Sequence, residues 1–404
     1  MPGVNSKMVV AALGLLVFVW NHVKHHAPAI RQEMLPVLLW GLLFSLSSYF
    51  SVVYNSTSDY IFATYFVSMC VWLGGAYFVV SLLRWIYGQV TLKVVFTYLA
   101  LTCAMQCVLA VVIDNIPAFA VLVDNIFVQP DLEYFEKNPR LYGIGASFDT
   151  AGIRFSCVLL STAYLIKNAS SHAQKNFYIV LFLIIGSIGN MISRTTIVGL
   201  AVACVYLILT STSWLKAQIT SKNIARFVGA CAILGCLIYA GNYLYSHSPG
   251  FQKAFDYGFE GFINLYQTGT FSTHSSDLLV QSLGYILPDN AKTWLIGDGY
   301  FADPNDPSAF YMGTDMGYIR LIFYCGLLGL AFFLVYFFCC TYVLCKREKN
   351  LTLFFICLLI VQFIVWIKIP TDIFCFYALV LLADGEKATI GVPSSKPLFK
   401  QTYI

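Results

Sequence analysis

The segment TDMGYIRLIFYCGLLGL, Thr314 to Leu330, joins a short polar stretch to an apolar run. Asp315 and Arg320 lie within about one and a half helical turns of each other, at the start of this run. A helix that enters a bilayer in this way holds the charged groups at its start close to one membrane face. The segment therefore predicts a membrane scaffold that carries charged side chains to one of its two faces.

The composition of the whole chain agrees with this prediction. Of its 404 residues, 59% are hydrophobic and only 11% are charged, whereas soluble domains carry about 25% charged residues. Apolar runs recur along the full length, and runs of roughly 17 to 25 residues are long enough to span a hydrocarbon core. We predict an all-α polytopic membrane protein that forms a single integral membrane domain, residues 1–404.

Ten or eleven membrane-spanning helices are predicted, with two long connections between them at 114–150 and 246–316. No signal-peptide cleavage site follows the first apolar run, residues 8–20. This run is short for a span, so it either crosses the membrane or lies flat on it. The predicted spans are 8–20, 34–54, 60–83, 92–113, 151–166, 176–192, 195–211, 227–245, 317–344, 351–367 and 369–383.

The charged loops predict the orientation. Most of the 24 basic residues fall in one set of alternate loops and in the C-terminal tail, and most of the 20 acidic residues fall in the other set. By the positive-inside rule the basic set is cytoplasmic, which places both long connections outside. Within the larger connection, aromatic residues recur at helical spacing between Phe251 and Tyr266, which indicates a helix in the membrane interface. We expect a second, apolar helix at Ser275–Leu287 and a turn at 303–307.

Four arginines are predicted at the outer face, where the positive-inside rule makes basic residues unfavourable: Arg140, Arg154, Arg194 and Arg320. Three of them lie close to predicted helix N-termini. Free N–H groups and an arginine together favour an anion at such a place. A shared anionic ligand of the size of pyrophosphate is one interpretation. The other is that the arginines reach lipid phosphates or pair with nearby acids.

Asp315 has two interpretations. Either Thr314 or Asp315 caps the helix that follows, or Asp315 is a catalytic residue that accepts a proton or positions an acceptor group. Asp315 and Arg320 are about 140° apart around a helix, so an ion pair within the helix is not expected.

Other charged residues lie in the predicted outer loops. His274 and Asp277 are one turn apart and form a candidate ligand-binding or catalytic pair, although a loop histidine is more often simply solvated. Lys368 either adds charge to the outer rim or pairs with Asp372. Asp149 lies between Arg140 and Arg154 and is simplest to interpret as neutralising one of them. Asp303 and Asp306 could hold a divalent ion, although the Asp-Pro-x-Asp-Pro pattern is more often a turn. The 13 cysteines lie in or beside apolar runs, so neither a disulfide framework nor a metal site is expected.

Four stretches resemble the O-antigen polymerase and O-antigen ligase superfamily of bacterial envelope glycosyltransferases, and most of all its polymerases (Wzy type). They are RLYGIGASFDTAGIRF (140–155), SRTTIVGL (193–200), TWLIGDGY (293–300) and TDMGYIRLIFYCGLLGL (314–330). The resemblance implies a GT-C-like membrane fold with a large structured outer loop. It also implies an inner-membrane location, an active site facing the periplasm, and no metal or other cofactor.

The resemblance further implies a substrate, a polyprenyl (undecaprenyl) pyrophosphate-linked glycan of the O-antigen or capsule type. Its anion-binding arginines correspond to Arg140 or Arg154, Arg194 and Arg320. The partners it implies are the bilayer and a chain-length regulator protein, with no nucleic acid. Ligases often carry a histidine where this chain has Asp315, which favours polymerisation. The alternatives are ligase-type transfer to another acceptor, a flippase or transporter, and an enzyme with a monophosphate donor, for which Asp59 is the candidate acid.

Overall fold

A computed structural model describes most of the chain. The described residues are 5–25, 32–127, 140–145, 148–210, 235, 239–274, 276–277, 280, 286–307 and 309–385. Within them the regular structure consists of α-helices and short 3-10 helices, and an isolated antiparallel bridge joins Ala302 to Phe310. The predicted all-α fold class is confirmed at this level.

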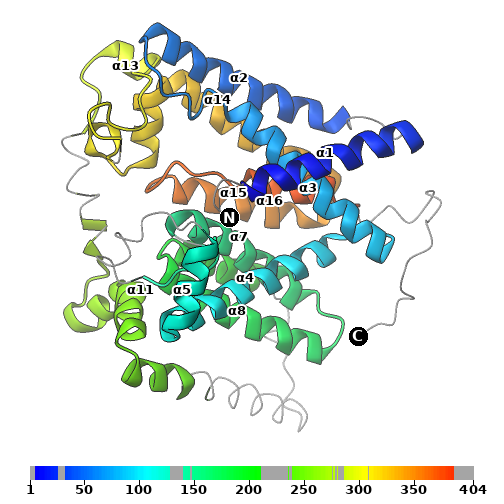
Figure 1. The fold of residues 1–404 in the computed structure, drawn as a ribbon, viewed down its shortest axis with the longest axis vertical. Coiled ribbons are helices and arrows are strands. Elements are labelled where there is room, and N and C mark those ends of the chain that lie inside the picture. Colours follow the sequence, from blue (N-terminus) through cyan, green and yellow to red (C-terminus); the bar gives the residue numbers. More distant parts are fainter. Residues whose placement is uncertain are drawn as a thin grey trace. The chain divides into compact units, whose positions relative to one another are not determined.

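The helices group into two compact units, which are described separately (Figure 1). Unit 1 contains Phe96–Thr273, and unit 2 contains Gly3–Val95 with His274–Ile404. Helix α4, Leu92–Asn115, begins at the boundary. The other helices of unit 1 are α5 (Pro117–Ile126), α7 (Phe148–Lys167), α8 (His172–Ile192), α9 (Thr196–Thr210) and α11 (Pro249–Thr268). Those of unit 2 are α1 (Ser6–His25), α2 (Leu35–Tyr54), α3 (Tyr65–Tyr87), α13 (Ala291–Leu295), α14 (Gly317–Arg347), α15 (Thr352–Val365) and α16 (Phe374–Leu382), with η1 (Gln32–Met34), η3 (Tyr311–Gly313) and η4 (Lys349–Leu351).

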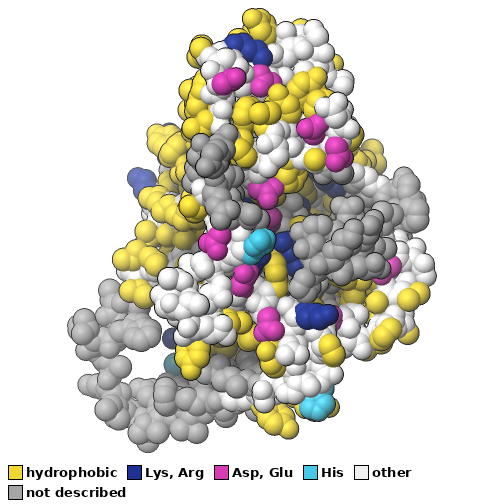
Figure 2. All heavy atoms as spheres, turned by 90° about the vertical axis from the view of Figure 1, so that its left-hand side faces the viewer, with side chains coloured by type: hydrophobic (Ala, Val, Ile, Leu, Met, Phe, Trp, Pro, Cys, Tyr) yellow, Lys and Arg dark blue, Asp and Glu magenta, His cyan; other side chains and the backbone are white. Residues whose placement is uncertain are grey.

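Six described helices are long and apolar enough to cross a membrane. They are Ser6–Lys24, Gln32–Tyr54, Tyr65–Tyr87, Leu92–Asn115, His172–Ile192 and Gly317–Arg347. Hydrophobic side chains are spread over the face drawn in Figure 2, with charged side chains among them. The chain is therefore a multi-pass membrane protein.

The remaining predicted spans have a mixed outcome. Those at 151–166, 195–211, 351–367 and 369–383 correspond to α7, α9, α15 and α16, which are helical but are shorter or less apolar than the six. The span at 227–245 lies largely outside the described residues. Helix α1 extends beyond the predicted apolar run, residues 8–20, on both sides. Its 20 residues give it a length of about 30 Å, enough to cross a membrane.

Aromatic packing forms the centre of unit 2. Phe333 of α14 stacks on Phe44 of α2, with ring centroids 4.0 Å apart, and on Trp366, with centroids 4.7 Å apart. All three side chains are fully buried. Such stacked pairs add to the stability that burial itself provides. They fix the part of α14 that carries Phe333 against α2 and Trp366.

Helix α14 is broken at Gly326, which has φ +67° and ψ −175°. The part after the break, residues 327–347, is about 31 Å long and is sufficient to span a hydrocarbon core. The part before it carries Arg320. A Cβ at residue 326 would lie 2.2 Å from the carbonyl of Leu295, so only glycine allows this close approach.

The break also leaves backbone carbonyl groups for other partners. The N–H of Asp298 donates to the carbonyl of Phe323 at 2.6 Å, and the N–H of Gly299 donates to that of Tyr324 at 3.1 Å. The hydroxyl of Ser51 also donates to the Tyr324 carbonyl, at 2.7 Å. The segment after α13 thus satisfies groups that an unbroken helix would bind internally.

In unit 1, α7 packs against α8 and α9, and its residues from Phe155 to Ile166 are all buried. The contact with α9 is close, because a Cβ at Gly199 would lie 2.1 Å from the Cα of Ser156. Helix α11 packs on α8 and confirms the helix predicted from the aromatic spacing. Helix α5 was not expected within the connection 114–150. The predicted helix at 275–287 lies mostly outside the described residues.

Candidate functional site

Unit 1 contains a cluster of charged residues centred on Arg194. Arg194 lies in the turn between α8 and α9, and one carboxylate holds both of its neighbours. The Oδ1 atom of Asp149 accepts hydrogen bonds from the hydroxyl groups of Ser193 at 3.1 Å and Thr195 at 2.7 Å. Asp149 lies in the first turn of α7. Its structural role is therefore to fix the Arg194 turn to the start of α7.

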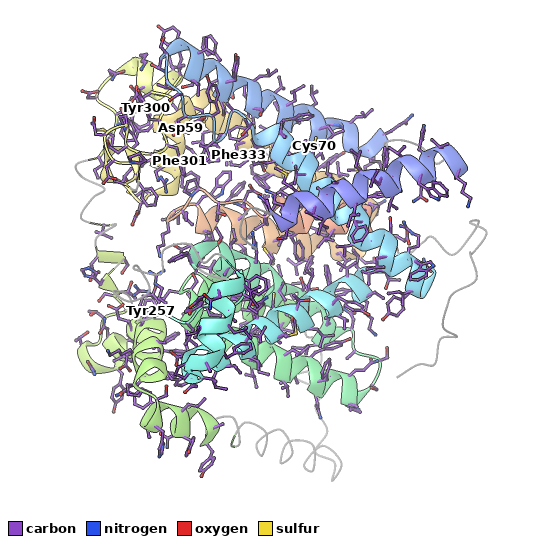
Figure 3. All side chains as sticks on the ribbon, in the orientation of Figure 1. Asp59, Cys70, Tyr257, Tyr300, Phe301 and Phe333 are labelled. Atoms are coloured by element: carbon purple, nitrogen blue, oxygen red, sulfur yellow. The ribbon has the colours of Figure 1, made fainter. Side chains whose placement is uncertain are left out.

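Two arginines of unit 1 converge on one aromatic ring. The guanidinium carbon of Arg194 lies 4.0 Å from the ring centroid of Tyr257, and that of Arg140 lies 4.6 Å from it. Tyr257 comes from α11 (Figure 3). Arg194 also forms an ion pair with Glu260, one helical turn further along α11. Because both guanidinium carbons lie within 4.6 Å of the same ring centroid, the two guanidinium groups are close to each other. We call these four residues the Tyr257 cluster.

The Tyr257 hydroxyl remains protonated in this setting. Burial raises the pKa of Tyr257, while the charges of Arg140 and Arg194 oppose that rise. The neutral ring attracts both cations through its π face. Two like charges held this close repel each other, and Glu260 offsets this repulsion in the absence of ligand. A ligand with two negative charges matches the site because it can pair with both arginines.

Of the two candidates at 140 and 154, Arg140 is the one that joins Arg194. Arg154 is exposed on α7, within a helix whose following turns are buried. The aromatic ring that Arg140 and Arg194 share brings them together although more than fifty residues separate them in the sequence.

Unit 2 contains a different arrangement around Arg320. The guanidinium group is sandwiched between two phenylalanine rings, 3.8 Å from the centroid of Phe301 and 3.6 Å from that of Phe310. Arg320 is only 3% exposed. Its Nε and Nη2 atoms are buried without a hydrogen-bond acceptor among the described residues. A buried guanidinium normally has such partners, so these two nitrogens form an unsatisfied donor edge.

Two acids interact electrostatically with Arg320, namely Asp315 and Asp59. Asp315 is exposed. The N-cap of α14 is Met316, and no side chain caps it, so the predicted capping role of Asp315 is wrong. The hydroxyl of Thr314 instead accepts the N–H of Met316 at 3.2 Å. The Asp315 carboxylate is accordingly available to solvent beside the positive charge of Arg320.

Asp59 has a structural role. Its Oδ2 atom accepts the backbone N–H groups of Phe301 at 2.8 Å and Ala302 at 3.2 Å, and its Oδ1 atom accepts that of Ile61 at 3.3 Å. Figure 3 shows Asp59 beside Phe301. The carboxylate thereby fixes the backbone that carries one of the two rings on Arg320.

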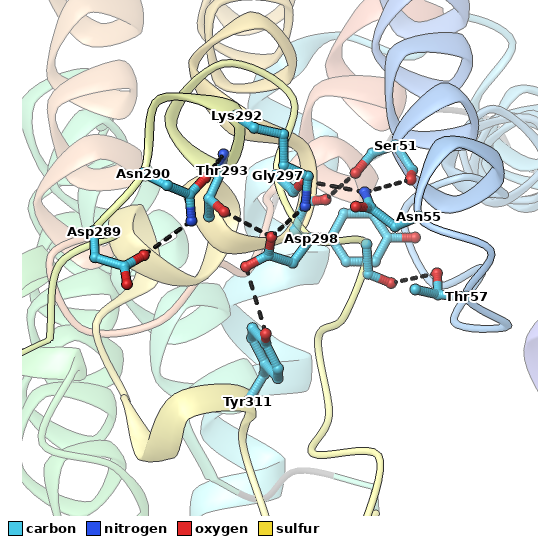
Figure 4. Close-up of polar contacts among 12 residues, drawn as sticks. Ser51, Asn55, Thr57, Asp289, Asn290, Lys292, Thr293, Gly297, Asp298 and Tyr311 are labelled. Carbon is cyan, nitrogen blue, oxygen red and sulfur yellow. Dashed lines mark hydrogen bonds and ion pairs between the residues drawn. The ribbon is translucent and has the colours of Figure 1, made fainter.

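The stretch 293–300 is built around Asp298 (Figure 4). Its Oδ1 atom accepts hydrogen bonds from Lys292 and Thr293, each at 2.7 Å, and its Oδ2 atom contacts the hydroxyl of Tyr311 at 3.4 Å. Burial and the Asp298 charge raise the pKa of Tyr311, so its hydroxyl stays protonated and can donate. This network ties α13 to the segment that carries Phe310.

The other predicted site residues lie at exposed positions or in turns. His274 is exposed, as is Asp277. Lys368 is partly buried in the turn after α15, and the Asp372 carboxylate accepts the N–H of Phe374 at 2.9 Å, at the start of α16. Asp303 is a turn residue, because its Oδ1 atom accepts the N–H groups of Asn305 and Asp306.

Sequence reasoning identified the arginines but missed the residues that hold them. Tyr257 and Glu260 lie in the aromatic-rich stretch interpreted as an interfacial helix, and no spacing rule connects them to residues 140 or 194. Phe301 and Phe310 lie on either side of the DPNDP turn. A pair of aromatic residues that flanks a turn is a signal that could have been detected in the sequence. Asp59 was considered only as a catalytic acid.

Among the described residues no group of three or more His, Cys, Asp or Glu side chains is arranged to hold a metal ion. Comparison of the chain with protein-family models, with curated proteins and with solved structures yields no match.

Proposed function

We propose that this protein is a membrane glycosyltransferase that polymerises polyprenyl-pyrophosphate-linked oligosaccharide repeat units at the outer face of the bacterial inner membrane. The observation that carries the proposal is the convergence of Arg140 and Arg194 on Tyr257, since it gathers two positive charges on one side chain. A diphosphate carries its negative charges on two neighbouring phosphorus centres, so two adjacent guanidinium groups can bind it. The resemblance of the four sequence stretches supports the same substrate class.

In the proposed reaction a sugar hydroxyl of one lipid-linked repeat attacks the anomeric carbon of a chain carried on a second polyprenyl pyrophosphate. A new glycosidic C–O bond forms, the bond from the anomeric carbon to the diphosphate oxygen breaks, and the hydroxyl proton passes to a carboxylate or to water. Negative charge grows on the diphosphate as it leaves. Arginines placed in advance stabilise this charge without reorganisation. In unit 2 the exposed carboxylate of Asp315, beside Arg320, is itself a candidate acceptor of a hydroxyl proton.

The break in α14 supports a reaction at the membrane surface. It allows Arg320 and Asp315 to lie beyond the hydrocarbon core, at the level where the phosphates of a lipid-linked substrate are found. The role of Asp59 argues against the enzyme with a monophosphate donor, because its carboxylate is already bound to three backbone N–H groups.

Reconstitution tests the proposal. Purified protein in proteoliposomes is supplied with polyprenyl-pyrophosphate-linked repeat units, and the products are separated on a gel. A ladder of lengths that disappears in Arg194→Ala supports polymerisation. Transfer of single repeats to an added lipid acceptor without a ladder indicates a ligase, and movement of the substrate across the bilayer without any product indicates a flippase.

A further inference from the structure

The unsatisfied nitrogens of Arg320 have a specific geometry. Nε and one terminal nitrogen form the side edge of the guanidinium plane, and the N–H bonds on this edge run nearly parallel. Nε and Nη2 are the two atoms that are buried without an acceptor among the described residues. An edge of this kind donates two hydrogen bonds to two oxygens on one phosphorus or carbon atom.

The two rings fix the plane in which that edge lies. Phe301 and Phe310 contact the guanidinium group at 3.8 Å and 3.6 Å, distances that correspond to stacking. A guanidinium group held in this way cannot rotate out of plane without losing these contacts. The edge therefore keeps one direction in the absence of ligand, which lowers the entropy lost when an oxyanion binds.

The two rings differ in exposure. The backbone of Phe301 is held by the Asp59 carboxylate at 2.8 Å. Phe310 is 40% exposed, and the two residues after Tyr311 have positive φ, 56° at Met312 and 64° at Gly313. A Cβ at Gly313 would meet no atom within 4 Å, so the space around it is open. The Phe310 backbone is held as well, because the N–H of Gly313 donates to its carbonyl at 2.8 Å, so the movement that can admit a ligand is a rotation of the exposed Phe310 side chain.

We propose that Arg320, Phe301 and Phe310 form a preorganised subsite for one oxyanion, bound through the Nε–Nη2 edge, and that Phe310 controls access to it. Phe301 and Phe310 are positioning residues that act through Arg320. The inference rests on the proposed function, whose lipid-linked glycan offers two kinds of group with two oxygens on one atom. These are one phosphate of the lipid diphosphate and the carboxylate of an acidic sugar in the glycan.

Chemical labelling of arginine tests access and occupancy without any need for turnover. Purified protein in detergent is treated with phenylglyoxal, and labelling of the Arg320 peptide is followed by mass spectrometry. We expect slow labelling in the wild type and labelling about tenfold faster in Phe310→Ala, since one stacking contact is lost. Inorganic pyrophosphate or glucuronate should protect Arg320 in both proteins. The better protector identifies the occupant.

A double-mutant cycle separates positioning from a general structural role. Affinity for the protecting anion is measured for Phe310→Leu, Arg320→Lys and the double variant. In the protein that retains Arg320, Phe310→Leu should weaken binding of the anion about tenfold. In the Arg320→Lys background it should have little effect, because a lysine ammonium group has no plane for the ring to orient. Phe310→Tyr should restore binding. Phe271→Leu, at another exposed aromatic residue, is the matched control.

Three results would overturn the inference: equal labelling of wild type and Phe310→Ala, no protection by either anion, or an equal effect of Phe310→Leu in both backgrounds. Failure of the proposed function gives a different pattern. In that case Arg320 is protected by an anion and the cycle shows coupling, but no polymer forms from lipid-linked repeats.

Discussion

The hydroxyl of Thr195 donates a hydrogen bond of 2.7 Å to the carboxylate of Asp149. This bond anchors the turn that carries Arg194 to the first turn of α7.

We expect Asp149→Leu to lower polymer formation about tenfold, because the turn that carries Arg194 then loses the hydrogen bonds that orient it. Asp149→Asn retains an acceptor oxygen and should be milder. The amount of polymer per unit of membrane protein measures the effect. Asp289→Leu, at an exposed acid, serves as the control, and equal loss in both variants would contradict the anchoring role.

Tyr257 should matter through its ring and not through its hydroxyl. Tyr257→Phe keeps the stacking surface for Arg140 and Arg194, and we expect near-normal activity. Tyr257→Leu removes it and should raise the KM for the lipid-linked substrate about tenfold. Because burial raises the pKa of Tyr257, its ionisation begins only above the ordinary tyrosine range. The pH profiles of wild type and Tyr257→Phe should therefore coincide between about pH 6 and 9. A titration that is present in the wild type and lost in Tyr257→Phe would show that the hydroxyl takes part.

Arg320 and Asp315 have separable roles. Arg320→Lys keeps the charge but not the planar fork, so it should lose most activity, and Arg320→Ala should lose nearly all. Asp315→Asn should lower turnover by roughly 10² if the carboxylate accepts the hydroxyl proton. Polymer length on a gel, with membrane levels checked by blot, measures each variant. Full-length polymer from Arg320→Ala at normal expression would remove this arginine from the site, and wild-type polymer from Asp315→Asn would remove the proton acceptor.

The break at Gly326 should make this residue intolerant of a side chain. Gly326→Ala places a Cβ 2.2 Å from the Leu295 carbonyl and adds about 1–3 kcal/mol of backbone strain. We expect a lower thermal unfolding midpoint in detergent. Gly75→Ala in α3 is the matched control, because its Cβ would make an ordinary contact of 3.8 Å. Equal midpoints for the two variants would show that α14 can straighten.

Membrane orientation can be checked with fusions. A reporter placed after Asn290 should report the outside, and one placed after Asn350 the cytoplasm, because basic residues gather on the side of Asn350. The readout is a pair of reporters, each active on only one side of the membrane. A cytoplasmic result for Asn290 would contradict the proposed function as well as the topology.

Hydrophobic length and aromatic spacing predicted the helices well, because both are local properties. They identified α11 from its phenylalanines and six spans from their apolar runs. The break in α14 was not predicted, because its sequence is apolar on both sides of Gly326 and the cause of the break is the docked segment after α13. The partners of the arginines were missed for a similar reason. Tyr257 meets Arg140 and Arg194 only through the packing of α11 on α8, which no sequence periodicity encodes.

The groups that donate hydrogen bonds to the free carbonyls at the break in α14 precede this helix in the chain. Ser51, Asp298 and Gly299, which donate to its free carbonyls, are all synthesised before Phe323 and Tyr324. A helix that enters lipid with unbound carbonyl groups is penalised by several kcal/mol for each group. During biosynthesis these donors have already emerged when α14 is inserted. A variant that lacks residues 291–299 would keep α14 but lose the Asp298 and Gly299 donors, so it would insert α14 unbroken or not at all.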